Sequence, residues 1–90
     1  MTRLGGNIRA ARAAQNLTQV ALGELCNCTA QYISELERGK VPSLRFLGML
    51  ALMLEAPLTL LFEGVAAEDL LTDEVTEARA TRRRRRARRA

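Results

Sequence analysis

Histidine and tryptophan are absent from this chain of 90 residues, whose aromatic residues are one tyrosine and two phenylalanines. Because histidine is the commonest general base and metal ligand, its absence weakens any enzymatic interpretation. The carboxylates do not gather on one face of a predicted helix, and no glycine-rich phosphate loop is present. We therefore expect a protein that is not an enzyme and uses no cofactor.

Cysteine is also scarce. Cys26 and Cys28 lie one residue apart, and there is no second cysteine pair. Without histidine or further cysteines, one chain can build neither a zinc site nor a disulfide framework. The pattern favours small buried or half-buried thiols in a reducing compartment.

Long hydrophobic runs are missing as well. No stretch approaches the roughly 18 consecutive apolar residues of a membrane span, and residues 1–6 lack the apolar run of a signal peptide. We expect a cytoplasmic protein with no membrane partner.

Aliphatic residues must supply the core. Hydrophobic residues make up 48% of the chain, and with so few aromatic side chains this composition suits packed helices better than sheets. The predicted fold class is all-α, with a compact five-helix domain at residues 1–64. A chain this short buries only a modest core and would profit from dimerisation.

Charge is strongly segregated behind this domain. Residues 63–77 carry six acidic and no basic side chains, whereas residues 78–90 carry eight arginines. We divide this part into an acidic extension at residues 65–78, which can form an amphipathic helix that docks on the domain, and an arginine-rich tail at residues 79–90. The tail is expected to be disordered or a frayed helix. It is interpreted as a phosphate-binding arm, the alternative being a solubilising tail that the acidic segment neutralises.

Apolar residues at helical spacing define the first predicted helix. It covers residues 3–15, with Leu4, Ile8 and Ala11 on its inner face. It ends near Asn16, which tolerates a left-handed turn.

Two threonine caps predict a pair of short helices after this turn. Thr18 begins a second helix that stops at about Cys26, and Thr29 begins a third helix that ends at Gly39. Asn27 supplies the turn between them. The expected core positions of the pair are Val20 or Ala21, Leu22, Leu25, Ile33 and Leu36.

Two further helices complete the predicted domain. Ser43 caps the fourth helix, and Pro57 opens a short fifth helix that Gly64 closes. Their expected inward positions are Leu44, Leu47, Leu50, Ala51, Leu54, Leu58, Leu61 and Phe62.

The paired second and third helices, at about residues 17–38, form the geometry in which one helix lies across DNA phosphates while the next enters the major groove. The residues that carry this pattern are Leu17-Thr18-Gln19, Leu22, Gly23, Asn27, Tyr32-Ile33-Ser34, Glu37-Arg38-Gly39-Lys40, Pro42-Ser43-Leu44, Leu47, Ala51 and Leu54. With them the chain resembles, over about residues 4–64, the phage repressor and Cro family of helix-turn-helix proteins, also called the XRE family. Asn27 departs from the usual turn glycine, and Ala21 removes a frequent acidic capping partner.

The resemblance implies a set of DNA contacts. Gln19 would contact a phosphate or brace the third helix, and Tyr32 would pack at the helix edge or reach a phosphate. Gln31 can pair with adenine through two hydrogen bonds, and Glu35 can accept a hydrogen bond from cytosine. Base edges or the flanking backbone would be contacted by Thr29, Ala30, Gln31, Ser34 and Glu35. Phosphates would be contacted by Arg38, Lys40 and Arg45.

Phe46, Met49 and Met53 form an additional apolar face on the fourth helix. It is either a wider core contact under the C-terminal segment or, as we favour, a dimer or partner interface. The implied function is a sequence-specific transcriptional regulator of double-stranded DNA, a repressor that binds a two-fold symmetric operator as a homodimer. The alternative is an antitoxin-like protein that binds a protein partner and autoregulates through the same domain.

Overall fold

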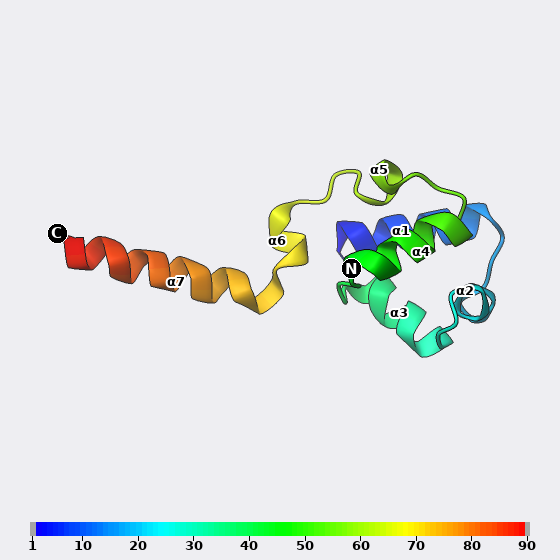
Figure 1. Cartoon of the computed structure of the whole chain (residues 1–90), viewed down its shortest axis with the longest axis horizontal. Coiled ribbons are helices and arrows are strands. Elements are labelled where there is room, and N and C mark those ends of the chain that lie inside the picture. Colours follow the sequence, from blue (N-terminus) through cyan, green and yellow to red (C-terminus); the bar gives the residue numbers. More distant parts are fainter. Residues whose placement is uncertain (1, 90) are drawn as a thin grey trace.

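The computed structural model describes residues 2–89, and for residues 72–78 and 89 it describes the backbone alone. These residues form helices and no strands, which confirms the all-α class (Figure 1). The helices are α1 (Arg3–Ala14), α2 (Gln19–Leu25), α3 (Ala30–Arg38), α4 (Leu44–Met53), α5 (Leu58–Leu61), α6 (Ala67–Leu70) and α7 (Thr72–Arg89). The described chain has seven helices in all: α1 to α5 lie at residues 3–61, and the acidic extension and the arginine-rich tail contain the two further helices, α6 and α7.

Hydroxyl side chains begin three of the central helices. The hydroxyls of Thr18, Thr29 and Ser43 accept hydrogen bonds of 3.0, 3.0 and 3.1 Å from backbone N–H groups three residues ahead. Each bond satisfies a donor that the first helical turn leaves unpaired. Asn16 and Asn27, which follow α1 and α2, have φ angles of 55° and 57°. The predicted caps and left-handed turns are therefore confirmed.

One hydrophobic core holds α1 to α5 together. α1 packs on α3 and α5, α2 packs on α3, and α4 contacts α5. Burying each large aliphatic side chain stabilises the fold by about 1.5–3 kcal/mol. The side chains with essentially no exposure are Ile8, Leu22, Ile33, Leu36, Leu50, Leu54 and Leu61.

α1 approaches α3 closely at Gly5. A Cβ atom built there would lie 2.5 Å from the carbonyl oxygen of Glu37 and 2.7 Å from that of Leu36. Any side chain at this position would therefore separate the two helices. The absence of a side chain lets α1 serve as a rigid support for α3.

Four expected core positions are wrong. Val20 and Leu25 on α2 are 57% and 48% exposed, Leu44 on α4 is 76% exposed, and Leu58 on α5 is 44% exposed. α2 has only seven residues, and it buries Leu22 and Gly23 while Cys26 at its C-terminal end fills the next inward position. Leu44 is the first residue of α4, whose buried residues, Leu47 and Leu50, begin one turn later.

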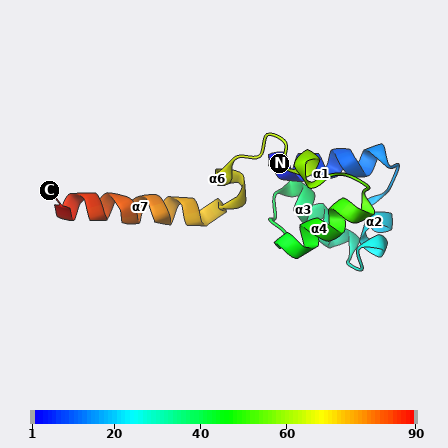
Figure 2. The same cartoon turned by 45° about the horizontal axis from the view of Figure 1, so that its top comes forward.

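The C-terminal part leaves the bundle (Figures 1 and 2). The acidic extension is not one continuous helix, because Leu71, with φ −126° and ψ 73°, separates α6 from α7. Val65 and Leu70 pack at the edge of the core, but Met49 remains 42% exposed. The extension therefore does not cover the apolar face of α4 as its predicted docking requires. α7 projects outward and gives the molecule extents of 57 × 23 × 21 Å.

Among the described residues, no helix combines the length and apolar character that a bilayer crossing requires.

Candidate nucleic-acid interface

α2, its following turn and α3 form one tightly packed unit. A Cβ atom added to Gly23 would lie 2.7 Å from the carbonyl oxygen of Cys28, so glycine lets α2 touch the turn directly. The N–H of Cys28 also donates to the carbonyl of Gly23 at 2.8 Å. Leu22, Ile33 and Leu36 are buried beneath this unit, which fixes the rotation of α3 and determines which of its residues face outward.

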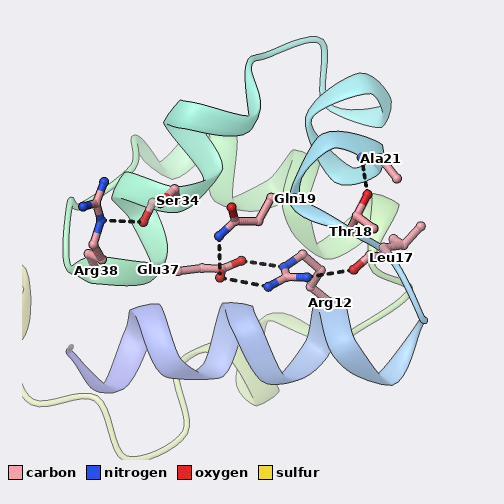
Figure 3. A network of polar contacts seen from close by, with 8 residues as sticks. All are labelled: Arg12, Leu17, Thr18, Gln19, Ala21, Ser34, Glu37 and Arg38. Atoms are coloured by element: carbon pink, nitrogen blue, oxygen red, sulfur yellow. Dashed lines mark hydrogen bonds and ion pairs between the residues drawn. The ribbon is translucent and has the colours of Figure 1, made fainter.

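A buried ion pair lies under α3 (Figure 3). Glu37 is only 3% exposed, and its two carboxylate oxygens accept hydrogen bonds from Nε and Nη2 of Arg12 at 2.7 and 3.1 Å. Arg12 also donates to the carbonyl of Leu17 at 2.8 Å. The hydrogen bonds to Glu37 raise the pKa of Arg12 above its ordinary value. This ion pair ties α1, the loop before α2 and α3 to one another.

Gln19 completes the same network. Its Nε2 donates to Oε1 of Glu37 at 3.2 Å, and its side chain points toward the ion pair in Figure 3. Of the two roles predicted for Gln19, the structure thus shows the bracing of α3. Sequence reasoning missed Arg12 and Glu37 as partners. The available signal was a carboxylate at an inward position of α3, beside Ile33 and Leu36, since a buried charge requires a partner.

The outward face of α3 carries polar groups suited to nucleic-acid contact. Thr29 and Gln31 are exposed, and Ala30, Ser34 and Glu35 are partly exposed. They occupy the first turns of α3, the part of a recognition helix that contacts base edges. The predicted base-reading residues are therefore brought together on one accessible surface.

Gln31 and Glu35 interact across one turn of this surface. Nε2 of Gln31 donates to Oε1 of Glu35 at 3.4 Å, and Nζ of Lys40 lies 3.2 Å from Oε2 of Glu35. The hydrogen bonds from the lysine and then from the glutamine lower the pKa of Glu35, which extends the ionised range of its carboxylate toward lower pH. Because the hydrogen bond from Gln31 to Glu35 is long and exposed, Gln31 can exchange it for hydrogen bonds to a base edge at little cost.

Tyr32 packs at the edge of α3, the first of its two predicted roles. Its ring meets the ring of Phe46 edge to face, with 5.2 Å between centroids and an interplanar angle of 85°. Nζ of Lys40 lies 5.1 Å from the centre of the tyrosine ring. The aromatic pair joins α3 to α4, and the lysine covers the ring on its outer side.

Three exposed cations lie near the end of α3 and the start of α4. Nε of Arg38 donates to the carbonyl of Ser34 at 3.4 Å, while Lys40 follows the helix and Arg45 is the second residue of α4. None of the described contacts joins Arg45 to the polar residues of α3. All three positions suit contacts to phosphates that flank a bound groove.

The predicted interface on α4 is only partly accessible. Phe46 and Met53 are half-buried against the core, whereas Met49 is 42% exposed. Leu44 and Leu52 extend the exposed apolar surface of this helix, at 76% and 69% exposure. We call these three exposed residues, Leu44, Met49 and Leu52, the α4 apolar surface.

The two cysteines agree with their predicted character. Cys26 is buried and Cys28 is half-buried, and both thiols are free. Burial raises the pKa of each thiol, so neither is activated as a thiolate. The described residues contain no cluster of cysteine, aspartate and glutamate that could hold a metal ion.

Comparison with known proteins agrees with this geometry. A family model described as helix-turn-helix matches residues 8–61, which include α2, α3 and α4 completely. No curated protein matches the chain significantly.

Proposed function

The chain belongs to the XRE, or phage repressor and Cro, family of helix-turn-helix DNA-binding regulators, and from this premise we propose that it is a repressor that binds a two-fold symmetric operator as a dimer. The observation that carries the proposal is the polar outer face of α3, held in a fixed orientation by the buried contacts of Glu37. Its role is binding, with no catalytic step.

Gln31 is the proposed base reader at the centre of this face. A glutamine amide presents one donor and one acceptor, which match N7 and the N6 amino group of adenine in the major groove. Ser34 and Glu35 lie one turn further along α3 and would contact neighbouring base pairs. Thr29 and the cations Arg38, Lys40 and Arg45 would hold the phosphates on either side.

Dimerisation is proposed because a single recognition helix reads few base pairs. Two copies related by two-fold symmetry would place their α3 helices about 34 Å apart, one turn of B-DNA. The α4 apolar surface supplies the exposed hydrophobic residues that such a contact requires. Phe46 and Met53 would support this surface from beneath, because they pack on the core.

Selection of bound sites from random duplex DNA tests the proposal. A repressor dimer should enrich an inverted repeat whose half-site centres are about ten base pairs apart. Enrichment of a single unrepeated half-site would contradict the dimer, and enrichment of no sequence would contradict specific recognition.

Sedimentation of substituted chains locates the dimer contact. Met49→Glu should shift the protein to a monomer, because it places a charge in an apolar contact. Leu60→Glu is the matched control, since Leu60 is 46% exposed on α5, beside Ala10 rather than α4. If Met49→Glu and Leu60→Glu associate equally, α4 does not form the dimer interface.

A second candidate is an antitoxin-like protein that uses the α4 apolar surface for a different protein and autoregulates through α3. It is favoured by the same exposed leucines and methionine. Purification distinguishes the two candidates, because a stable complex with a second polypeptide that Met49→Glu abolishes would support this function over the homodimer.

A further inference from the structure

We propose that one face of α7 is a second DNA-binding site, which takes the phosphates of the duplex beside the operator. The site consists of Arg79, Arg82, Arg83 and Arg86, which we call the α7 arginine face. It differs from α3 in contacting the sugar–phosphate backbone without reading bases. The inference deepens the proposed function and rests on it for the position of the DNA.

The helix arranges its arginines on two sides. Arg79, Arg82, Arg83 and Arg86 are spaced three and four residues apart and line one shallow depression of about 160 Å³. Such spacing places side chains next to one another on a helix surface. Arg84, Arg85 and Arg88 lie on the opposite side, where Nη2 of Arg84 donates to the hydroxyl of Thr81 at 3.3 Å.

Among the described side chains, one carboxylate lies against the α7 arginine face. Arg79 lies 3.5 Å from the carboxylate of Glu68 on α6, which connects the first turn of the face to the preceding helix. Among the side chains that the structure describes, no carboxylate forms an ion pair with Arg82, Arg83 or Arg86. Like charges one turn apart destabilise a helix, so a bound polyanion would stabilise α7 as well as being attracted by it.

The geometry fits a nucleic-acid backbone. The α7 arginine face extends about 10 Å along the helix axis, a length over which a DNA duplex carries roughly six phosphates. The planar guanidinium group binds phosphate through two parallel hydrogen bonds. Since every member of the face is an arginine, it offers one kind of contact, repeated at the spacing of helix turns.

The position of α7 favours DNA over a lipid surface. Figure 1 shows α7 leaving the bundle at the end where α3 terminates, so an operator bound by α3 would have its flanking duplex within reach. The helix spans about 27 Å, or roughly eight base pairs at 3.4 Å per step. In its arginine-rich half the only apolar residues are Ala80 and Ala87, which leaves nothing to insert into a bilayer.

Two charge-matched triple variants of the full chain test the α7 arginine face. Arg82→Gln, Arg83→Gln and Arg86→Gln together remove three charges from the face, and Arg84→Gln, Arg85→Gln and Arg88→Gln remove three from the opposite side. Glutamine preserves helix propensity. Affinity is measured against salt on the selected operator, either trimmed flush or flanked on each side by about ten base pairs, one turn of B-DNA.

On the flanked operator, the face variant should lose up to about 2.7 in the slope of log affinity against log salt, at 0.9 per phosphate. The affinity of the unmodified chain divided by that of the face variant should therefore fall about six-fold for each doubling of the salt concentration. The opposite-side variant should lose less than one third as much. On the trimmed operator, all three proteins should bind alike.

Several results would overturn the assignment. Equal loss in both variants would mean that α7 acts as a diffuse polycation with no preferred face. A preference for particular flanking sequences would mean that the arginines read bases. If the α7 arginine face binds duplex RNA or anionic vesicles more tightly than it binds duplex DNA, the face would be assigned to that ligand. If the chain selects no operator, the proposed function fails separately, and the same two variants on random duplex DNA still decide the α7 arginine face.

Discussion

Residues 3–61 and residues 67–89 are both helical, but different forces hold their helices. α1 to α5 share a core of buried aliphatic side chains, with one buried ion pair between them. α6 and α7 contain no fully buried hydrophobic residue among their described side chains, and their one described ion pair is exposed. An exposed ion pair contributes about 0–1 kcal/mol, far less than the core. The bundle therefore fixes geometry, whereas α7 presents charge.

This contrast suggests a division of work on DNA. Sequence reading needs side chains held at fixed positions, which the packing under α3 supplies. Attraction to phosphates depends on charge and on counterion release, and needs no rigid scaffold. The difference between the two regions should appear in stability as well as in binding.

Removal of the buried carboxylate should have the largest effect. Glu37→Ala leaves the Arg12 guanidinium, whose side chain is 15% exposed, without its partner. Loss of one member of a buried ion pair costs about 3–5 kcal/mol. Urea unfolding should show this loss, while the control Glu35→Ala, on the exposed side of the same helix, should leave stability nearly unchanged. Similar values for the two variants would show that the ion pair does not hold the bundle.

A methyl group at the contact between α1 and α3 should have the next largest effect. Gly5→Ala would force α1 away from the carbonyls of Leu36 and Glu37, which we expect to cost about 1–3 kcal/mol. Gly48 is the matched control, because a Cβ there meets nothing within 4 Å. Gly48→Ala should leave stability unchanged or raise it by about 0.5–1 kcal/mol. Urea unfolding of both variants at the same protein concentration measures the two changes in stability. A Gly5→Ala chain as stable as the unmodified chain would contradict the close packing of α1 on α3.

Truncation after Ala78 should have the smallest effect on stability. None of the removed residues whose side chains the structure describes belongs to the hydrophobic core, so the free energy of unfolding should change by less than about 0.5 kcal/mol. Urea unfolding of the truncated and full-length chains measures the change. A clear loss of stability would mean that α7 supports the bundle, and the two regions would then no longer be independent.

Much of the bundle was predictable from sequence because its signals are local. Thr18, Thr29 and Ser43 each cap a helix as predicted, and each bond depends on residues three apart. The grouping of Gln31, Ser34 and Glu35 on one face follows from helical periodicity in the same way.

Tertiary contacts account for what the sequence left unresolved. The pairing of Arg12 with Glu37 joins residues 25 positions apart, and helical spacing alone gave Arg12 no partner. Leu44 looked like a core residue because it has the right periodicity, but its side chain is 76% exposed at the start of α4. The break at Leu71 carries no proline or glycine to mark it.

The most direct test of the division between α3 and α7 is the ratio of affinities for the selected operator and for a scrambled duplex, measured at one salt concentration. Gln31→Ala should lower this ratio by a factor that corresponds to about 1–3 kcal/mol of binding free energy per lost base contact. Its affinity for scrambled DNA should stay unchanged. Truncation after Ala78 should weaken binding to both duplexes by the same factor and leave the ratio intact. If Gln31→Ala weakens both duplexes equally, or if truncation changes the ratio, α3 does not read the sequence alone and the account is contradicted.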